Sequence, residues 1–222
     1  MARKTVLAVL KDKAEKVVID KENIRKWLGN EKVEYGKKEM SDQIGTVTGL
    51  AYTSFGGDIL QIEANQFKGK GRLVLTGKLG DVMKESASIA LDYIRAHASD
   101  YNILVENFEE IDIHIHVPEG AVPKDGPSAG VTMTTALVSC LSNTPVKADL
   151  AMTGEVTLRG NVLPIGGLKE KSLAAHRSGI TTILIPKGNV KDLDEIPQEV
   201  KDAITYIPVS NVSEVLEHAL VK

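Results

Sequence analysis

The chain has 222 residues, of which 42% are apolar and 26% are charged, and its 27 basic and 30 acidic side chains give a formal charge of −3. This length and apolar content suffice for a sizeable core in one or two domains. The absence of a basic excess and the 4% of aromatic residues argue against a nucleic-acid-binding domain, which needs a basic field or stacking platforms.

The cysteine content and the apolar runs argue for a cytoplasmic, non-membrane protein. A single cysteine, Cys140, excludes an intrachain disulfide and favours a reducing compartment. The apolar run near the start is only about six residues long, which is too short for a signal sequence. No segment approaches the ~20 apolar residues that span a bilayer.

The first residues predict a small helical fragment followed by a linker. Asp20 is suited to cap a short helix that ends before Gly29. The polar stretch 30–43 has no hydrophobic period and is the best candidate for a linker. We therefore place a domain boundary near residue 40, which divides the chain into residues 1–40 and 41–222.

Beyond this boundary the pattern predicts the α+β class, a sheet of several strands with helices packed against it. The clearest strand is 111–117, because its strict alternation places Asp112, His114 and His116 on one face and aliphatic residues on the other. Further strands are expected over 45–53, 58–63, 72–76, 181–186 and 204–207. Helices are expected over 79–98, 128–142, 168–178 and 212–220, where apolar residues recur at spacings of three and four.

The segment PKDGPSAG, residues 123–130, places Ser128 at the first turn of a predicted helix. In support, Asp125 can cap that helix, Pro127 needs no amide partner there, and Gly126 lets the backbone approach a ligand. Free amides at a helix N-terminus are suited to hold an oxyanion. The segment indicates a nucleophilic serine, although the same residues support an ordinary helix cap about equally well.

A serine nucleophile needs a base, and residues 166–179 supply two lysines. On a helical wheel Lys171 falls among the leucine and alanine residues, whereas Lys169 lies on the polar side. Burial would lower the pKa of Lys171 from ~10.4 toward neutrality and allow it to accept a proton. The wheel selects Lys171, and the alternative is a lysine whose stem packs on the core while its ammonium reaches water.

The string GPSAG also matches GxSxG, the nucleophile elbow of α/β hydrolases. That elbow requires a strand running directly into the serine, but here the strand ends near Val117 and prolines intervene. Its partners would have to be Asp194 and His218, both in helical or loop stretches near the end of the chain. The context therefore argues against a hydrolase triad.

Three other features lack the pattern that their chemistry requires. His114 and His116 share a strand face without a third clustered ligand, so we predict no metal site. Cys140 lies on the apolar stripe of its helix and is expected in the core. The run KGKGR, residues 68–72, does not match a phosphate-binding loop, so no nucleotide binds by that route.

Three segments resemble the Lon protease family: DIHIHVPEG, PKDGPSAG and MTGEVTLRGNVLPIGGLKEK. The resemblance extends across nearly the whole chain. It implies the proteolytic domain of an ATP-dependent serine endopeptidase, with Ser128 as nucleophile and Lys171 as its only base, a Ser–Lys dyad without histidine or aspartate. It also implies that the Thr153 hydroxyl orients the lysine amine by a hydrogen bond.

The segment GLAYTSFGGDILQIE, residues 49–63, resembles the first hairpin of that family, whose edge lies beside the substrate groove. An extended peptide can add a strand at such an edge, so Tyr52, Gly56 and Gly57 are candidate substrate-binding residues.

The N-terminal part resembles the end of the helical subdomain of the family's ATPase. ATP and magnesium would therefore bind in a module that these residues lack, and we expect no cofactor in this chain. The implied partners are unfolded or damaged polypeptides and copies of the chain in a hexamer. The alternative is a noncatalytic peptide-binding fragment that keeps the fold.

Overall fold

The computed structural model describes residues 2–12, 17–29, 41–53, 56–104, 108–118 and 124–221. The chain divides into two compact units, Met1–Tyr35 and Gly36–Lys222. The boundary predicted near residue 40 lies outside the described residues.

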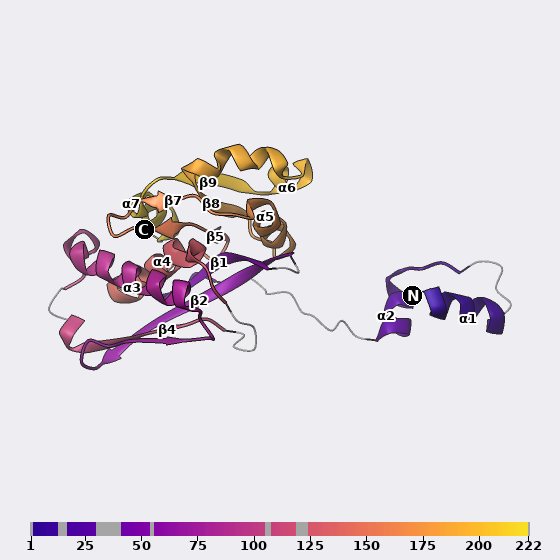
Figure 1. The fold of residues 1–222 in the computed structure, drawn as a ribbon, viewed down its shortest axis with the longest axis horizontal. Coiled ribbons are helices and arrows are strands. Elements are labelled where there is room, and N and C mark those ends of the chain that lie inside the picture. Colours follow the sequence, from indigo (N-terminus) through magenta and orange to yellow (C-terminus); the bar gives the residue numbers. More distant parts are fainter. Residues whose placement is uncertain are drawn as a thin grey trace. The chain divides into compact units, whose positions relative to one another are not determined.

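The first unit contains two short helices, α1 (Ala2–Asp12) and α2 (Lys21–Leu28) (Figure 1). The carbonyl of Asp20 accepts a hydrogen bond from the Ile24 amide at 3.0 Å, which starts α2. Gly29 follows the helix with a φ of +83°, a conformation that favours glycine. The predicted helix and its end at Gly29 are therefore confirmed.

The second unit is built on a seven-stranded mixed sheet in the order β3-β4-β2-β1-β5-β8-β9 (Figure 1). Strand β2 runs antiparallel to β1 and β4, and the other neighbours run parallel. Two further strands, β6 and β7, form a separate hairpin. The strands are β1 (Thr46–Thr53), β2 (Gly56–Lys68), β3 (Leu73–Thr76), β4 (Ile111–His116), β5 (Leu150–Met152), β6 (Glu155–Val156), β7 (Val162–Leu163), β8 (Thr182–Pro186) and β9 (Thr205–Val209).

Helices pack against this sheet, as the predicted mixed α and β class requires. They are α3 (Asp81–Ala96), α4 (Gly130–Ser142), α5 (Leu168–Arg177), α6 (Gln198–Ala203) and α7 (Val212–Ala219). The 3-10 turns Ala98–Tyr101, Pro127–Ala129 and Lys187–Glu195 connect larger elements.

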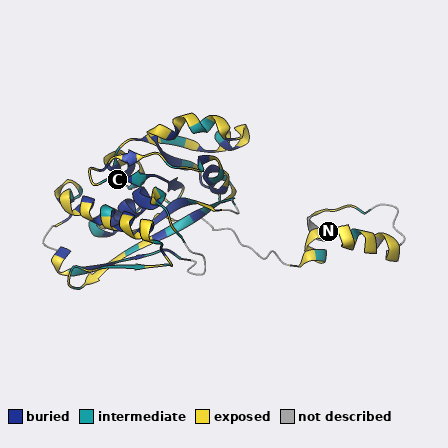
Figure 2. Ribbon diagram, in the orientation of Figure 1, coloured by how far each residue is buried: buried dark blue, intermediate teal, exposed yellow. Residues whose placement is uncertain are grey.

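The two faces of the sheet belong to different hydrophobic clusters. Alternation along β1 sends Val47 into the cluster that contains α3 and α4, and Leu50 into the cluster that contains α5. Helix α4 is buried on nearly every side, because it lies between the sheet and helices α3 and α7 (Figure 2). Cys140 on α4 is buried, as predicted.

The structure corrects the predicted strands in several places, and the short strands β6 and β7 were not predicted. Strand β2 continues beyond the expected end at Glu63 to Lys68. Its pairing with the antiparallel β1 stops at Glu63, which lies opposite the first residue of β1, and residues 63–68 pair with β4 instead. Strand β5 was not predicted, since three residues that are all buried show no alternation. On α3, Val82 has the spacing of an inward-facing residue but is 41% exposed.

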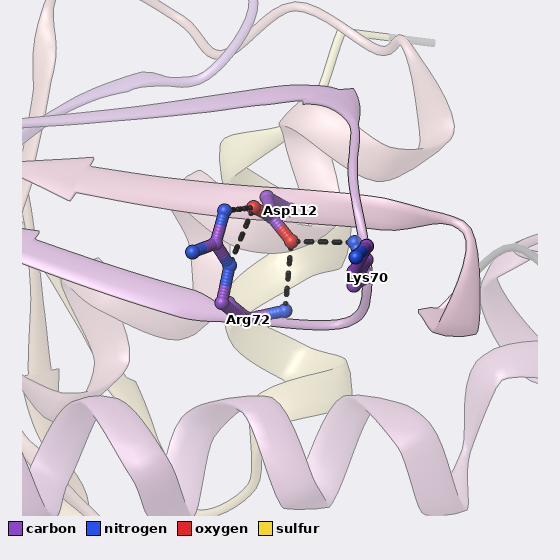
Figure 3. Close-up of polar contacts among 3 residues, drawn as sticks. All are labelled: Lys70, Arg72 and Asp112. Carbon is purple, nitrogen blue, oxygen red and sulfur yellow. Dashed lines mark hydrogen bonds and ion pairs between the residues drawn. The ribbon is translucent and has the colours of Figure 1, made fainter.

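Asp112 is a buried charge on the otherwise polar face of β4 (Figure 3). Its carboxylate accepts two guanidinium hydrogen bonds from Arg72, at 2.9 and 2.6 Å, and the amides of Lys70 and Arg72 at 2.7 and 3.0 Å. These donors, led by the Arg72 side chain, lower the pKa of Asp112 to about 2. The ion pair ties the turn between β2 and β3 to β4.

Candidate active site

Ser128 lies in the 3-10 turn Pro127–Ala129, which leads directly into α4. Its carbonyl accepts hydrogen bonds from the Gly154 amide at 2.9 Å and the Thr153 hydroxyl at 3.3 Å. The Gly154 carbonyl in turn accepts the Val131 amide at 3.0 Å. These bonds fix the serine turn against the end of β5 and leave Ser128 lining a cavity of about 630 Å³.

Two backbone amides beside Ser128 are suited to hold an oxyanion. The Gly126 amide is occupied, because it donates to the Asp125 carboxylate at 2.9 Å, and Gly126 has a φ of +126°. Within the described part of the chain, the amides of Ser128 and Ala129 have no backbone acceptor outside their own helical turn. Because they lie at the start of the helical run into α4, both amides are candidate donors to charge that develops on a carbonyl oxygen.

Asp125 does not cap the helix that it precedes, so that expectation is wrong. Its Oδ1 accepts a hydrogen bond from the Met83 amide at 3.1 Å, in the first turn of α3. The N-cap residue of α3 is Gly80, which has no side chain to fill this role. A Cβ at Gly80 would lie 2.3 Å from the Asp125 carboxyl carbon, so glycine makes room for the approach. Asp125 therefore caps α3 and ties the serine turn to it.

Lys171 reaches the cavity from α5, on the other face of the sheet. Its side chain is only 2% exposed, whereas Lys169 is exposed, as the helical wheel predicts. Burial lowers the pKa of Lys171 from 10.5 to about 8. A substantial fraction of the amine is therefore neutral in mildly alkaline solution and able to accept a proton.

Thr153 connects the lysine to the serine turn. Its buried hydroxyl accepts a hydrogen bond from Lys171 Nζ at 3.0 Å and donates its own proton to the Ser128 carbonyl at 3.3 Å. The hydrogen bonds between described residues include none from Ser128 Oγ to Lys171 Nζ, although both residues line the same cavity. Such bonds often tighten only when substrate is bound.

The cavity also borders an open strand edge. Strand β1 pairs with β5 at Thr48 and Gly49, and beyond these two pairs residues 50–52 have no ladder partner in β5. Tyr52 lies there, 57% exposed, with its ring against Gly167. The apolar lining includes Leu50, Ile59, Leu60, Met83, Pro164 and Ile165. An extended peptide has both an edge to pair with and an apolar wall to contact.

Gly56 and Gly57 are absent from the described lining of the cavity, unlike Tyr52. Gly57 lies against the first turn of α5, where a Cβ would be 1.9 Å from the Glu170 carbonyl oxygen. Its own carbonyl accepts a hydrogen bond from the Arg177 guanidinium at 2.9 Å. Gly57 thus lets the hairpin of β1 and β2 pack beside the helix that carries Lys171.

Sequence reasoning missed several lining residues, among them Asp58, Met83 and Ile165. They come from β2, from α3 and from the segment before α5, which are far apart in the chain. Met83 lies in the helix expected over 79–98, where its position gives no sign that it borders a cavity. No motif marks any of the three, so only the fold brings them to one cavity.

The two histidines of β4 share one hydrogen-bond partner. His114 Nε2 and His116 Nδ1 both share a hydrogen bond with the Thr76 hydroxyl, at 2.9 and 2.6 Å. Within the described ranges, no group of three His, Cys, Asp or Glu side chains is arranged to hold a metal ion. Likewise, none of the helices described is both long and apolar enough to cross a membrane.

Comparison with known proteins gives one consistent family. The model described as the Lon protease (S16) C-terminal proteolytic domain matches residues 18–222. The Lon protease of Mycoplasma mycoides subsp. mycoides is 57% identical over 217 residues, which cover 98% of this chain and 27% of that protein. Lon protease 1 of Bacillus subtilis is 53% identical over 221 residues, covering 100% and 29%. The chain thus spans less than a third of the length of these relatives.

Proposed function

The chain belongs to the Lon protease family, and from this premise we propose that it is a serine endopeptidase in which Ser128 is the nucleophile and Lys171 the general base. The observation that carries the proposal is the burial of Lys171 beside the same cavity as Ser128. A lysine with a pKa of about 8 is a usable base, whereas a solvated lysine is not.

In the acylation step, neutral Lys171 takes the hydroxyl proton as Ser128 Oγ attacks the carbonyl carbon of the scissile peptide bond. The amides of Ser128 and Ala129 stabilise the negative charge on the carbonyl oxygen. Thr153 holds the lysine amine in place through the 3.0 Å hydrogen bond. Protonated Lys171 then donates the proton to the departing amine, and the bond between carbonyl and nitrogen breaks.

In the deacylation step, Lys171 accepts a proton from water as the water oxygen attacks the ester of Ser128. The same amides hold the oxyanion, and the lysine returns the proton to Ser128 Oγ. The peptide substrate pairs with the open edge of β1, with Tyr52 at the rim of the groove. This arrangement favours extended, and hence unfolded, polypeptides.

Coupling to ATP, assembly into a hexamer and a bacterial cytoplasmic location are parts of the same proposal. ATP and magnesium would act in regions of the relatives that these residues do not span. The bacterial sources of the relatives and the single cysteine support the assigned location.

The second candidate is a noncatalytic peptide-binding domain with the same fold. The absence of a direct hydrogen bond between Ser128 and Lys171 among the described residues is the observation that favours it. The lowered pKa of Lys171 argues against it, because burying an amine is costly for stability and a binding role does not require it.

Covalent labelling separates these two candidates. A fluorophosphonate forms a stable phosphonyl ester with an activated serine as fluoride leaves, and mass spectrometry of the digested protein locates the adduct. We expect an adduct on Ser128 that Ser128→Ala and prior heat unfolding both abolish. An adduct on another residue would contradict the assignment of the nucleophile. Absence of both labelling and peptide hydrolysis would favour the noncatalytic domain.

A further inference from the structure

Among the described residues of the cavity lining, one acidic side chain takes part neither in the proposed mechanism nor in the capping of a helix. Four charged side chains among the residues that the structure describes line it: Asp58, Lys124, Asp125 and Lys171. Asp125 accepts two amide hydrogen bonds, and Lys124 Nζ is directed to the Gly77 carbonyl at 3.4 Å. Asp58 Oδ1 accepts only the amide of its neighbour Ile59, at 2.9 Å. No ion pair between described residues includes Asp58.

We propose that Asp58 is a specificity-determining residue that selects a lysine or arginine side chain of the bound peptide. This inference rests on the proposed function, because it concerns the peptide held at the open edge of β1. It assigns that peptide a chemical class, a segment with a basic residue at one fixed position beside the cleaved bond.

The register of the sheet places Asp58 within reach of such a side chain. Asp58 pairs with Ala51 across β1 and β2, so the two side chains project from the same face. A peptide residue that pairs opposite Ala51 on the other edge of β1 projects from that face too. Its side chain must cross Ala51 to reach Asp58. Because the Ala51 side chain is only a methyl group, it does not block that path.

Distances along this path match a long basic side chain. Neighbouring strands are about 4.8 Å apart, so the peptide backbone would lie about 10 Å from β2. An extended lysine or arginine side chain reaches about 6 Å, and a carboxylate with its hydrogen bond spans the remainder. A glutamate at the same position would bring two carboxylates together in a half-buried groove, which is unfavourable.

The structural alternative is that Asp58 merely accepts the Ile59 amide. Asp58→Asn tests this directly, because asparagine keeps the side-chain oxygen that accepts this hydrogen bond and removes only the charge. Asp92→Asn is the matched control, since it makes the same change of charge on α3 at a residue outside the cavity lining.

The experiment compares fluorogenic peptides that differ at one position, which carries lysine, norleucine or glutamate, with that position moved stepwise along the peptide. At one position the wild-type kcat/KM should be about 10-fold higher for lysine than for norleucine, and lowest for glutamate. Asp58→Asn should bring the lysine to norleucine ratio close to one and improve the glutamate peptide. Asp92→Asn should leave both ratios unchanged.

An unchanged ratio in Asp58→Asn, or an equal loss of kcat/KM for every peptide, would overturn the inference. Fluorescence polarisation of the same peptides with Ser128→Ala provides a second readout that does not depend on turnover. If wild type cleaves no peptide, the proposed function fails, but a lysine preference in binding that Asp58→Asn removes would still support the role of Asp58. Equal binding of the three peptides would contradict it.

Discussion

Lys171 Nζ donates a 3.0 Å hydrogen bond to Thr153 Oγ1 in the interior of the protein, with the lysine 2% exposed and the threonine fully buried. This contact joins the two faces of the sheet, because Lys171 belongs to α5 and Thr153 holds the carbonyl of Ser128. It positions an amine whose burial lowers its pKa to about 8. The predictions below concern this contact and the packing around it.

Peptide hydrolysis should increase with pH and then level off near the pKa of Lys171. The base must be neutral, so below about 8 the value of kcat/KM should rise about 10-fold per pH unit. The measurement is kcat/KM between about pH 6 and about pH 9.5 for a peptide without ionisable groups. A flat profile over this range would show that another group, or no group, accepts the proton.

Replacing Lys171 with methionine should stabilise the folded state at neutral pH. The pKa of Lys171 is about 8 in the folded state and 10.5 in the unfolded state, so the unfolded chain binds the proton more tightly. Below pH 8 this difference lowers the free energy of unfolding by up to about 3 kcal/mol. Wild-type stability should therefore rise between pH 8 and 10.5 and approach that of Lys171→Met.

Urea unfolding at several pH values measures this difference, with Lys169→Met as the exposed control that should change little. A gap between Lys171→Met and wild type that stays constant from neutral pH to above 10.5 would contradict the lowered pKa.

The Thr153 hydroxyl should be required for activity, and the threonine methyl group should not. Thr153→Val removes the acceptor for Lys171 and the donor to Ser128, so kcat/KM should fall by about 10- to 100-fold. Thr153→Ser restores both hydrogen bonds and should recover most of the activity. The pH at which kcat/KM levels off should also shift in Thr153→Val. An unchanged dependence of kcat/KM on pH would indicate that Thr153 has a purely structural role.

Adjacent glycines in the hairpin should respond differently to alanine. At Gly57 a Cβ would lie 1.9 Å from the Glu170 carbonyl, so Gly57→Ala must push the hairpin away from α5 and should cost several kcal/mol. At Gly56 the φ of +115° makes alanine strained, but no atom lies within 4 Å, and the cost should be about 1–3 kcal/mol. Thermal unfolding of the two variants measures this order, and a reversed order would refute the packing role of Gly57.

Elements with a strong local signal were predictable from the sequence. The buried position of Lys171 followed from the wheel of α5, whose period of 3.6 residues is undisturbed. The helix after Ser128 and the alternation of β4 were also evident. These features depend on residues three or four positions apart in a helix, or two apart in a strand. The local sequence is therefore enough to predict them.

Features that depend on contacts distant in the chain were not predictable. Asp125 has the local pattern of an N-cap for the helix that follows it. Its carboxylate instead accepts a hydrogen bond from the Met83 amide of α3, a tertiary contact that the local pattern does not indicate. Strand β5 is recognisable only by its parallel neighbours β1 and β8. Asp58 lines the cavity because β2 pairs with β1, and no sequence motif indicates this position.

The measurement that tests the central claim most directly is peptide hydrolysis by wild type, Lys171→Ala and Lys169→Ala, with circular dichroism to confirm that each is folded. Both substitutions remove one lysine side chain from α5, but of the two only Lys171 lines the cavity with Ser128. We expect Lys169→Ala to retain near wild-type kcat/KM and Lys171→Ala to lose at least about 1,000-fold. Retained activity in a folded Lys171→Ala variant would contradict the assignment of Lys171 as the base.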